Sequence, residues 1–192
     1  KPYLILGKLS IFCFFDENKI ENKQQQYDCN IKKGRQWTVK ITNLLKKTLD
    51  GTAETAPDQL TIYHPNENDQ EAQIHKYSRA QIHLFLRVRF GILDFGDVEN
   101  QITDDTGDGG LDAYHIDEDK KTIYLIQSKY KTTPKGYLNN DVDWREFFKM
   151  ELDRIVRGEA GSIAGNEYNG KVKIFQQKIT NISDIGRWKY AL

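Results

Sequence analysis

The chain has 192 residues, with 28 basic and 28 acidic side chains and a formal net charge of +0. This neutrality disfavours a protein that coats nucleic acid regardless of sequence, because such proteins are usually basic overall. No run of residues reaches the roughly 18 apolar positions of a membrane span. The two cysteines, Cys13 and Cys29, lack metal-ligand spacing, and so few cysteines favour a cytoplasmic protein over a disulfide-rich secreted one.

Residues 1–66 form the first predicted unit, a β-rich accessory segment. Its start, Lys1–Phe15, lacks a small-residue cleavage site and begins without Met, which favours a piece of a longer protein. Basic residues around Trp37 are typical of single-stranded nucleic-acid binding, but we favour a solvated face with one core tryptophan. Aromatic and β-branched residues predict strands over Tyr3–Phe15, Tyr27–Lys32, Gln36–Ile41 and Gln59–Tyr63, with a loop at Asp16–Gln26.

The second predicted unit, residues 67–192, begins in the polar break His64–Gln70. Apolar residues then recur at helical spacing over Glu71–Phe90, and Gly91 follows as a stop signal. His75 and His83 lie on this helix without a third partner spaced for zinc, so we expect packing or surface roles for them.

A β-hairpin is predicted from two runs, Leu111–Ile116 and Thr122–Lys129, on either side of the polar stretch Asp117–Lys121. Three glycines in four positions lead into the first strand and suit a sharp bend of the backbone. Folding the hairpin brings Asp112 opposite Ile126–Gln127, and side chains two residues apart leave the same face of a strand. An acid, an amide and a lysine therefore converge at one end of the hairpin.

This trio, Asp112, Gln127 and Lys129, suits metal-assisted hydrolysis of a phosphodiester. Oxygen ligands favour Mg²⁺, with Mn²⁺ as a substitute, because Mg²⁺ needs only one or two protein carboxylates besides substrate phosphate. A neighbouring lysine can position the attacking water or pair with the phosphate. For any one of these residues alone, an ordinary structural role would be the better interpretation.

The run ITDDTGDGGLDAYHIDEDKKTIYLIQSKY resembles the core of the PD-(D/E)XK nuclease superfamily, in the QxK variant of Mrr-type restriction endonucleases. It is most similar to the N-terminal domain of abortive phage infection (AIPR) proteins. The resemblance implies a restriction-endonuclease-like α+β fold of order α-β-β-β-α-β, a mixed sheet flanked by helices. It also implies that Asp112 and Gln127 bind the metal and that Lys129 is the catalytic lysine. The implied activity is cleavage of DNA in restriction or phage defence.

The resemblance has two departures. Gln127 is neutral where a Glu is usual, and the helix before the hairpin offers Gln81 where many relatives carry a Glu, with Glu71 further upstream. A catalytically weak nuclease fold that only binds nucleic acid or a protein, and an RNA-cleaving enzyme, therefore stay open as alternatives. A homodimer is also left open.

The segment Asp97–Asp119 contains nine acids and neither Lys nor Arg. Such a block repels itself unless cations or arginines offset it, and we expect most of its acids to face water. Asp108 is the second candidate for a metal ligand, although its place among glycines favours a turn. Beyond the hairpin, Lys131 and Lys135 extend a basic rim from Lys129 that would hold flanking phosphates.

The C-terminal third predicts a helix over Val142–Arg157 that ends at Gly158, then a strand over Val172–Gln176. Another helix is expected to begin within Asn181–Leu192. The implied fold needs one more strand, which we expect near Phe95–Thr103, where the alternation is poor.

Overall fold

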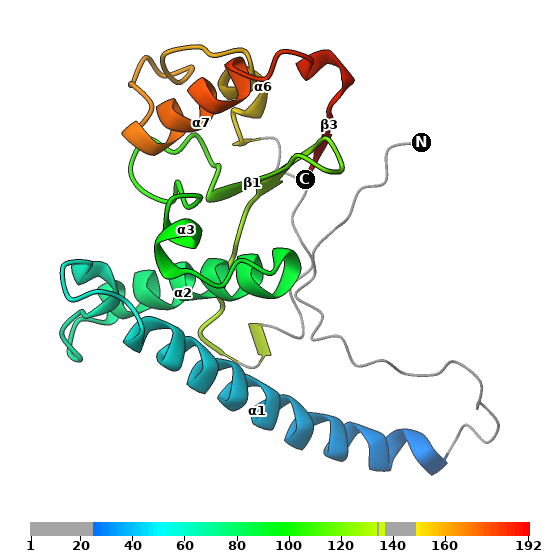
Figure 1. Cartoon of the computed structure of the whole chain (residues 1–192). Helices are drawn as coiled ribbons and strands as arrows, with labels where there is room; N and C mark the ends of the chain where they lie inside the picture. The colour runs from blue at the N-terminus through cyan, green and yellow to red at the C-terminus, as the bar shows by residue number, and fades with distance from the viewer. Residues whose placement is uncertain (1–24, 134, 137–148) are drawn as a thin grey trace.

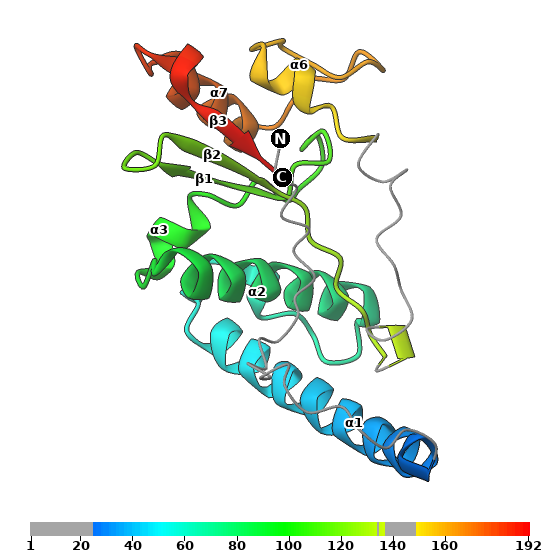
Figure 2. The same cartoon turned by 90° about the vertical axis from the view of Figure 1, so that its right-hand side faces the viewer.

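The computed structural model describes residues 25–133, 135–136 and 149–192, with side chains from residue 39 onward. Helices α6 and α7 cover one face of a small sheet, α3 and α2 lie against the other face, and α1 packs along α2 (Figures 1 and 2). Over the described part of the chain, no helix combines the length and apolar character needed to cross a membrane. The elements are α1 (Gln25–Glu54), the 3-10 helix η1 (Thr61–Tyr63), α2 (Gln70–Phe90), α3 (Phe95–Glu99), β1 (Ala113–Asp117), β2 (Thr122–Ile126), α6 (Leu152–Val156), α7 (Gly170–Thr180), the 3-10 helix η2 (Ile185–Arg187) and β3 (Lys189–Ala191).

The sheet confirms the predicted hairpin. Its strand order is β1-β2-β3, with β1 antiparallel to β2 and β3 parallel to β2. Ala113 pairs with Ile126 at one end of the hairpin and Asp117 with Thr122 at the other. Continued by one pair, this register puts Asp112 opposite Gln127, as the sequence predicts.

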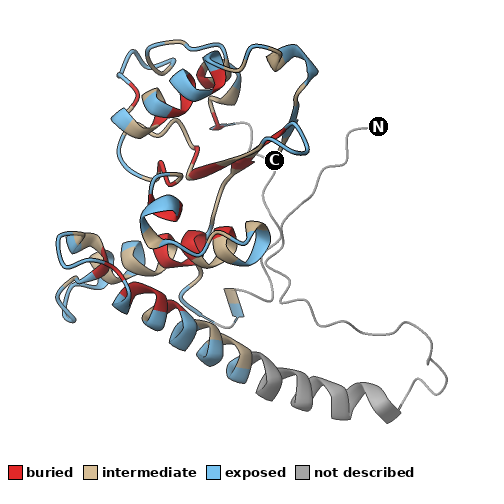
Figure 3. Cartoon of the chain, viewed as in Figure 1, coloured by how far each residue is buried: buried red, intermediate tan, exposed pale blue. Residues whose placement is uncertain are grey.

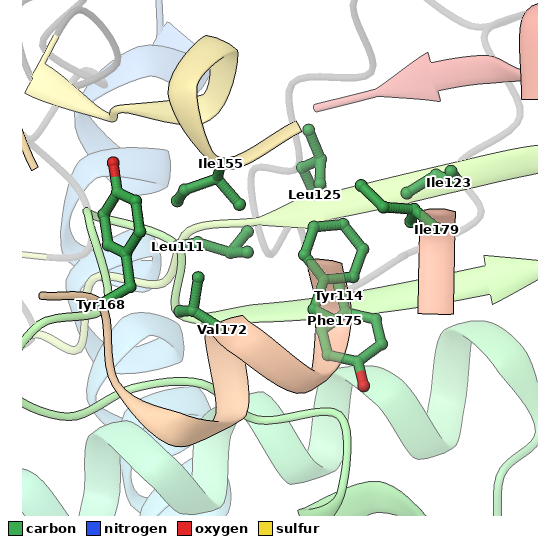
Figure 4. Packing of buried hydrophobic residues seen from close by; sticks show 9 residues of the cluster. All are labelled: Leu111, Tyr114, Ile123, Leu125, Ile155, Tyr168, Val172, Phe175 and Ile179. Atoms are coloured by element: carbon green, nitrogen blue, oxygen red, sulfur yellow. The ribbon is translucent and has the colours of Figure 1, made fainter. Parts of the chain in front are cut away.

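Two apolar clusters fix the sheet between its helical layers. Alternate residues of a strand face opposite sides, so Tyr114 and Leu125 pack toward α7 while Ala113 packs toward α2. Figure 3 shows buried positions on the inner sides of α2 and α7 and near the C-terminal end of α1. The cluster under α6 and α7, seen in Figure 4, contains Leu111, Tyr114, Ile123, Leu125, Ile155, Tyr168, Val172, Phe175 and Ile179.

The prediction of a β-rich N-terminal segment is wrong for its described part. Tyr27–Lys32 and Gln36–Ile41 belong to α1, and Gln59–Tyr63 forms a turn and η1, whereas Tyr3–Phe15 lies outside the described residues. Residue type favoured strands there, but the apolar spacing is helical. The apolar α1 side chains that are at least partly buried recur every fourth residue at Ile41, Leu45, Leu49 and Ala53. The division into 1–66 and 67–192 stays a prediction.

Helix α2 confirms the predicted helix before the hairpin. The Asp69 side chain accepts a hydrogen bond from the Ala72 N–H at 3.0 Å, which caps the N-terminus. Gly91 ends the helix with a φ of 71°, a left-handed conformation that glycine adopts without steric cost. This helix runs beneath the strands of the hairpin (Figure 2).

The predicted strand over Val172–Gln176 is wrong, because these residues lie in α7. The Asn169 side chain accepts from the Val172 N–H at 2.9 Å and begins the helix. Buried Val172, Phe175 and Ile179 then follow helical spacing. The helix expected within Asn181–Leu192 is also wrong beyond η2, since Lys189–Ala191 forms β3 by pairing with β2.

The extra strand expected near Phe95–Thr103 also needs correction. Phe95–Glu99 is helix α3 rather than part of a strand, because Asp94 caps it through the Asp97 N–H at 2.9 Å. A single antiparallel bridge, Ile102 to Ala113, stands where the extra strand was expected. The described residues thus form a mixed α+β fold with a three-stranded sheet.

The helix predicted over Val142–Arg157 is interrupted at Met150–Glu151, and α6 begins at Leu152; residues 142–148 lie outside the described part. Gly158 ends α6 as predicted, with a φ of 76°. Met150 instead packs its backbone and side chain against Gly110, so the entrance to β1 occupies the place where the helix would continue.

Candidate metal centre at the end of the hairpin

A tight loop, residues 103–112, leads from the Ile102 bridge into β1. The backbone N–H groups of Thr103 and Asp104 both donate to the Asp112 carbonyl, at 2.9 and 3.0 Å. The Asp112 N–H in turn donates to the Ile126 carbonyl at 3.0 Å, which fastens the loop to the end of β2. The loop therefore begins and ends at the same point of the sheet.

Three aspartates of this loop converge. Asp104, Asp108 and Asp112 each present a carboxylate oxygen, and these oxygens lie within 4.8 Å of one another. All three residues are half-buried. Ligands on opposite sides of an octahedral Mg²⁺ lie about 4.2 Å apart, so the spacing is close to that of a divalent-cation site with oxygen ligands. The residues present fit such an ion.

Asp112 is the most perturbed acid of the three. Burial is the main cause that raises its pKa to about 7, and the neighbouring Asp104 and Asp108 contribute in the same direction. The Ser128 N–H and the nearby Lys129 act in the opposite direction. Close carboxylates disfavour the charged form of one another, and a bound cation removes that penalty.

Asp104 and Asp108 show the same tendency. Burial raises the pKa of both carboxyls, and a neighbouring acid adds to the effect on each, Asp105 on Asp104 and Asp104 on Asp108. Asp108 also confirms its predicted role in a turn, because its Oδ1 accepts the Gly110 N–H at 2.7 Å. A turn role and a place in the cluster are thus compatible for this residue.

The second strand brings Ser128 and Lys129 to the same place. The Ser128 N–H donates to Oδ2 of Asp112, and the Ser128 hydroxyl accepts from Nε2 of Gln81 on α2 at 2.9 Å. Lys129 is exposed and close enough to Asp112 to lower its pKa. The predicted pair Asp112 and Lys129 is therefore brought together, whereas metal binding by Gln127 stays a prediction.

The segment after β2 turns toward α2. Tyr130 stacks on Tyr77 of α2, with ring centroids 5.4 Å apart and an interplanar angle of 23°. Lys131 is half-buried and Lys135 is exposed. The stack of Tyr77 and Tyr130 anchors the chain directly after Lys129. Nucleic-acid binding by Lys131 and Lys135 stays a prediction.

A buried polar network lies behind the loop of residues 103–112, which we call the acid loop. Glu99 accepts from the Tyr63 hydroxyl at 2.7 Å and pairs with Arg79. His83 lies 3.1 Å from the same carboxylate, and Lys171 donates to it at 3.2 Å. The expectation that most acids of this segment face water is therefore wrong for Glu99, which is 8% exposed.

The charges of this network follow from its contacts. Burial alone would raise the pKa of Glu99, but hydrogen bonds from His83 and Arg79 hold it well below its ordinary value. Burial lowers the pKa of His83 despite the opposing effect of Glu99. At neutral pH the network is therefore an ionised Glu99 with Arg79 as its buried counter-ion.

Compared with known proteins, the chain matches no family model, no curated protein and no solved structure. The hairpin motif and the geometry around it are therefore what support the site.

Two functional candidates were not singled out from the sequence. Asp104 stands eight residues before Asp112, and only the closed loop between them makes them neighbours. Arg79 lies 25 residues before Asp104, yet its Nη1 donates to the Asp104 carbonyl at 2.7 Å. The spacing of four residues between Asp104, Asp108 and Asp112 was the one local signal available.

Proposed function

We propose that this chain is a Mg²⁺-dependent nuclease that hydrolyses phosphodiester bonds of DNA. The observation that carries the proposal is the convergence of Asp104, Asp108 and Asp112 beside Lys129 at one end of the hairpin. It joins the acid and the lysine that the resemblance to PD-(D/E)XK nucleases assigns to the metal and to catalysis. Mn²⁺ would serve as a substitute ion.

The aspartates would hold the cation, and Asp112 would be its principal ligand. One Asp112 oxygen already accepts the Ser128 N–H, which fixes the direction of the carboxylate and leaves its other oxygen for the ion. A divalent cation held there offsets the negative charge that develops at phosphorus. Gln127 would add a neutral amide oxygen to the set.

Lys129 would act on the substrate side. It is exposed at the end of β2 and electrostatically coupled to Asp112, so its ammonium can reach a phosphate that approaches the carboxylates. An ammonium there can pair with the phosphate or position the attacking water. Lys131 and Lys135 follow along the chain and would contact flanking phosphates.

DNA is the substrate that the resemblance favours, and a cytoplasmic role in restriction or phage defence has the same support. Hydrolysis of RNA would use the same cation and the same lysine. An assay with both polymers therefore decides between the two substrates. The alternative, a nuclease fold that only binds nucleic acid or a protein, would show affinity for that partner but no cleavage.

The test is cleavage of plasmid DNA and of RNA in Mg²⁺, in Mn²⁺ and in EDTA. We expect cleavage that EDTA abolishes and that Asp112→Ala and Lys129→Ala each reduce at least about a hundredfold, the usual loss when a transition-state charge partner is removed. Matched controls are Asp119→Ala, an exposed acid at the far end of the hairpin, and Lys47→Ala, an exposed lysine on α1. Full activity in either site variant, with protein free of contaminating nuclease, would overturn the proposal.

A further inference from the structure

Arg79 connects helix α2 to the acid loop. It is 7% exposed, and its two terminal nitrogens have different partners. Nη2 pairs with Glu99, and Nη1 donates to the Asp104 carbonyl at 2.7 Å. A guanidinium presents its donors in a rigid fork, so the two contacts fix each other's direction.

Glu99 is itself held from three other elements. Tyr63 of η1 donates to Oε2 at 2.7 Å, and His83 of α2 lies 3.1 Å from the same oxygen. Lys171 of α7 donates to the Glu99 carbonyl at 2.8 Å. The carboxylate that orients Arg79 therefore has little freedom to move.

Asp104 is the residue on which this fixed guanidinium acts. Its backbone N–H is bonded to the Asp112 carbonyl at 3.0 Å, and its own carbonyl is bonded to Arg79. Both backbone groups of Asp104 are thus anchored, one to the strand and one to α2. The backbone orientation restricts where its carboxylate can lie.

We propose that Arg79 is a positioning residue that holds the Asp104 carboxylate beside Asp108 and Asp112, so that α2 shapes the cation site without supplying a ligand. This inference depends on the proposed function, since it concerns the same cation site. The Arg79–Glu99 pair would then have a second role besides the stability of the core.

The charge of Arg79 and its anchoring of Asp104 should affect cation affinity in opposite directions, so the two roles can be separated by experiment. Arg79 is a cation near the carboxylates, so removal of its charge alone would favour a second cation at the site. Loss of the Asp104 anchor would weaken that cation instead. The double variant Arg79→Met/Glu99→Gln removes one positive and one negative charge together, which leaves position as the main change.

The experiment is a calorimetric titration of the full chain with Mn²⁺, with folding checked by circular dichroism and thermal unfolding. We expect the wild type to bind Mn²⁺ and the double variant to bind at least tenfold more weakly at an unchanged helix content. Lys171→Met is the matched control, because Lys171 contacts Glu99 but makes its bonds away from Asp104. It should bind Mn²⁺ as the wild type does.

A folded double variant with wild-type affinity would overturn the positioning role while leaving the proposed nuclease intact. Absence of Mn²⁺ binding in the wild type would overturn the cation site itself, and the inference with it. If the double variant does not fold, Arg79→Lys takes its place. A lysine keeps the positive charge beside Glu99 but lacks the second guanidinium nitrogen that bonds Asp104, so the Mn²⁺ affinity should still fall at least tenfold. Wild-type Mn²⁺ affinity in this variant would refute the positioning role.

Discussion

The Ser128 N–H donates a hydrogen bond to Oδ2 of Asp112, across the end of the hairpin. Gln81 on α2 holds the same serine through its hydroxyl at 2.9 Å. The carboxylate is therefore directed by β2 and supported by α2, although it belongs to the start of β1. Its direction depends on three segments that are far apart in the sequence.

The first prediction concerns the effect of pH on cation binding. Burial raises the pKa of Asp112 to about 7, so a proton competes with the cation below that pH. The apparent Mn²⁺ affinity should fall about tenfold per pH unit as the pH decreases below 7, and should level off above 7. Calorimetric titrations at pH 6, 7 and 8 measure it, and an affinity independent of pH would show that Asp112 is not a ligand.

Substitution Asp112→Asn removes the titrating group but leaves an oxygen that can accept the Ser128 N–H. We expect Mn²⁺ binding to become too weak to measure at all three pH values, while thermal unfolding shows a folded protein. Asp119→Asn, at the exposed turn of the same hairpin, serves as the control and should keep both the affinity and its pH dependence.

The next prediction concerns Gln127, which stands opposite Asp112 in the continued register. A glutamate at this position has nearly the same shape and adds a negative charge. Gln127→Glu should tighten Mn²⁺ binding to the free protein by tenfold or more, or about 1.4 kcal/mol. Titration of both proteins with Mn²⁺ decides it, and equal affinities would mean that Gln127 does not touch the ion.

Packing beneath the acid loop gives a prediction about stability. Gly109 has a φ of 64°, and a Cβ there would lie 2.9 Å from side-chain atoms of both Ile155 and Tyr168. Gly109→Ala therefore adds overpacking to left-handed strain and should destabilise the fold by about 2–4 kcal/mol. Gly165→Ala isolates the strain, because Gly165 has a φ of 83° with nothing within 4 Å of its Cβ position.

The two glycine variants are compared by urea unfolding monitored by fluorescence. Gly165→Ala should cost only about 1 kcal/mol. If both variants lose the same amount, the contact of Gly109 with Ile155 and Tyr168 does not limit the space at the loop.

Local signals predicted the parts of the fold that local chemistry determines. Helix α2 follows from its apolar period and from Gly91, and the hairpin follows from the alternation on either side of Asp117–Lys121. The apposition of Asp112 and Gln127 needs no more than this register. These parts of the site could therefore be found in the sequence.

The remaining parts depend on tertiary contacts. Residues around Ile41 have strand-favouring side chains, but they belong to α1, a long helix that packs against α2. Glu99 belongs to an acidic block, and its burial becomes tolerable through contacts with distant residues, among them Arg79, Tyr63 and His83. Asp104 joins the site because the loop closes, and its spacing of four residues from Asp108 does not by itself determine that closure.

The last prediction concerns the dependence of stability on pH. Hydrogen bonds from His83 and Arg79 hold the pKa of Glu99 well below its ordinary value. The unfolded chain therefore binds a proton at Glu99 at a higher pH than the folded chain does. The stabilisation is complete above the unfolded pKa of about 4.5 and is lost as the pH falls below it.

Replacement of Glu99 by Gln tests this directly, because the amide can still accept from Tyr63 but carries no charge for Arg79. At pH 7 the variant should be less stable by about 3–5 kcal/mol, the usual cost of leaving one partner of a buried pair alone. The difference should stay constant down to about pH 5.5 and shrink steadily from about pH 4.5 downward, since protonation of Glu99 in the unfolded wild type then favours unfolding. Urea unfolding at pH 7, 5.5, 4 and 3 measures it.

Glu167→Gln is the control. Glu167 also pairs with a lysine, but its side chain is 81% exposed, so the stability of this variant should differ little from that of the wild type at every pH. A difference for Glu99→Gln that is the same at pH 7 and pH 3 would mean that the ion pair with Arg79 does not stabilise the fold through its charge.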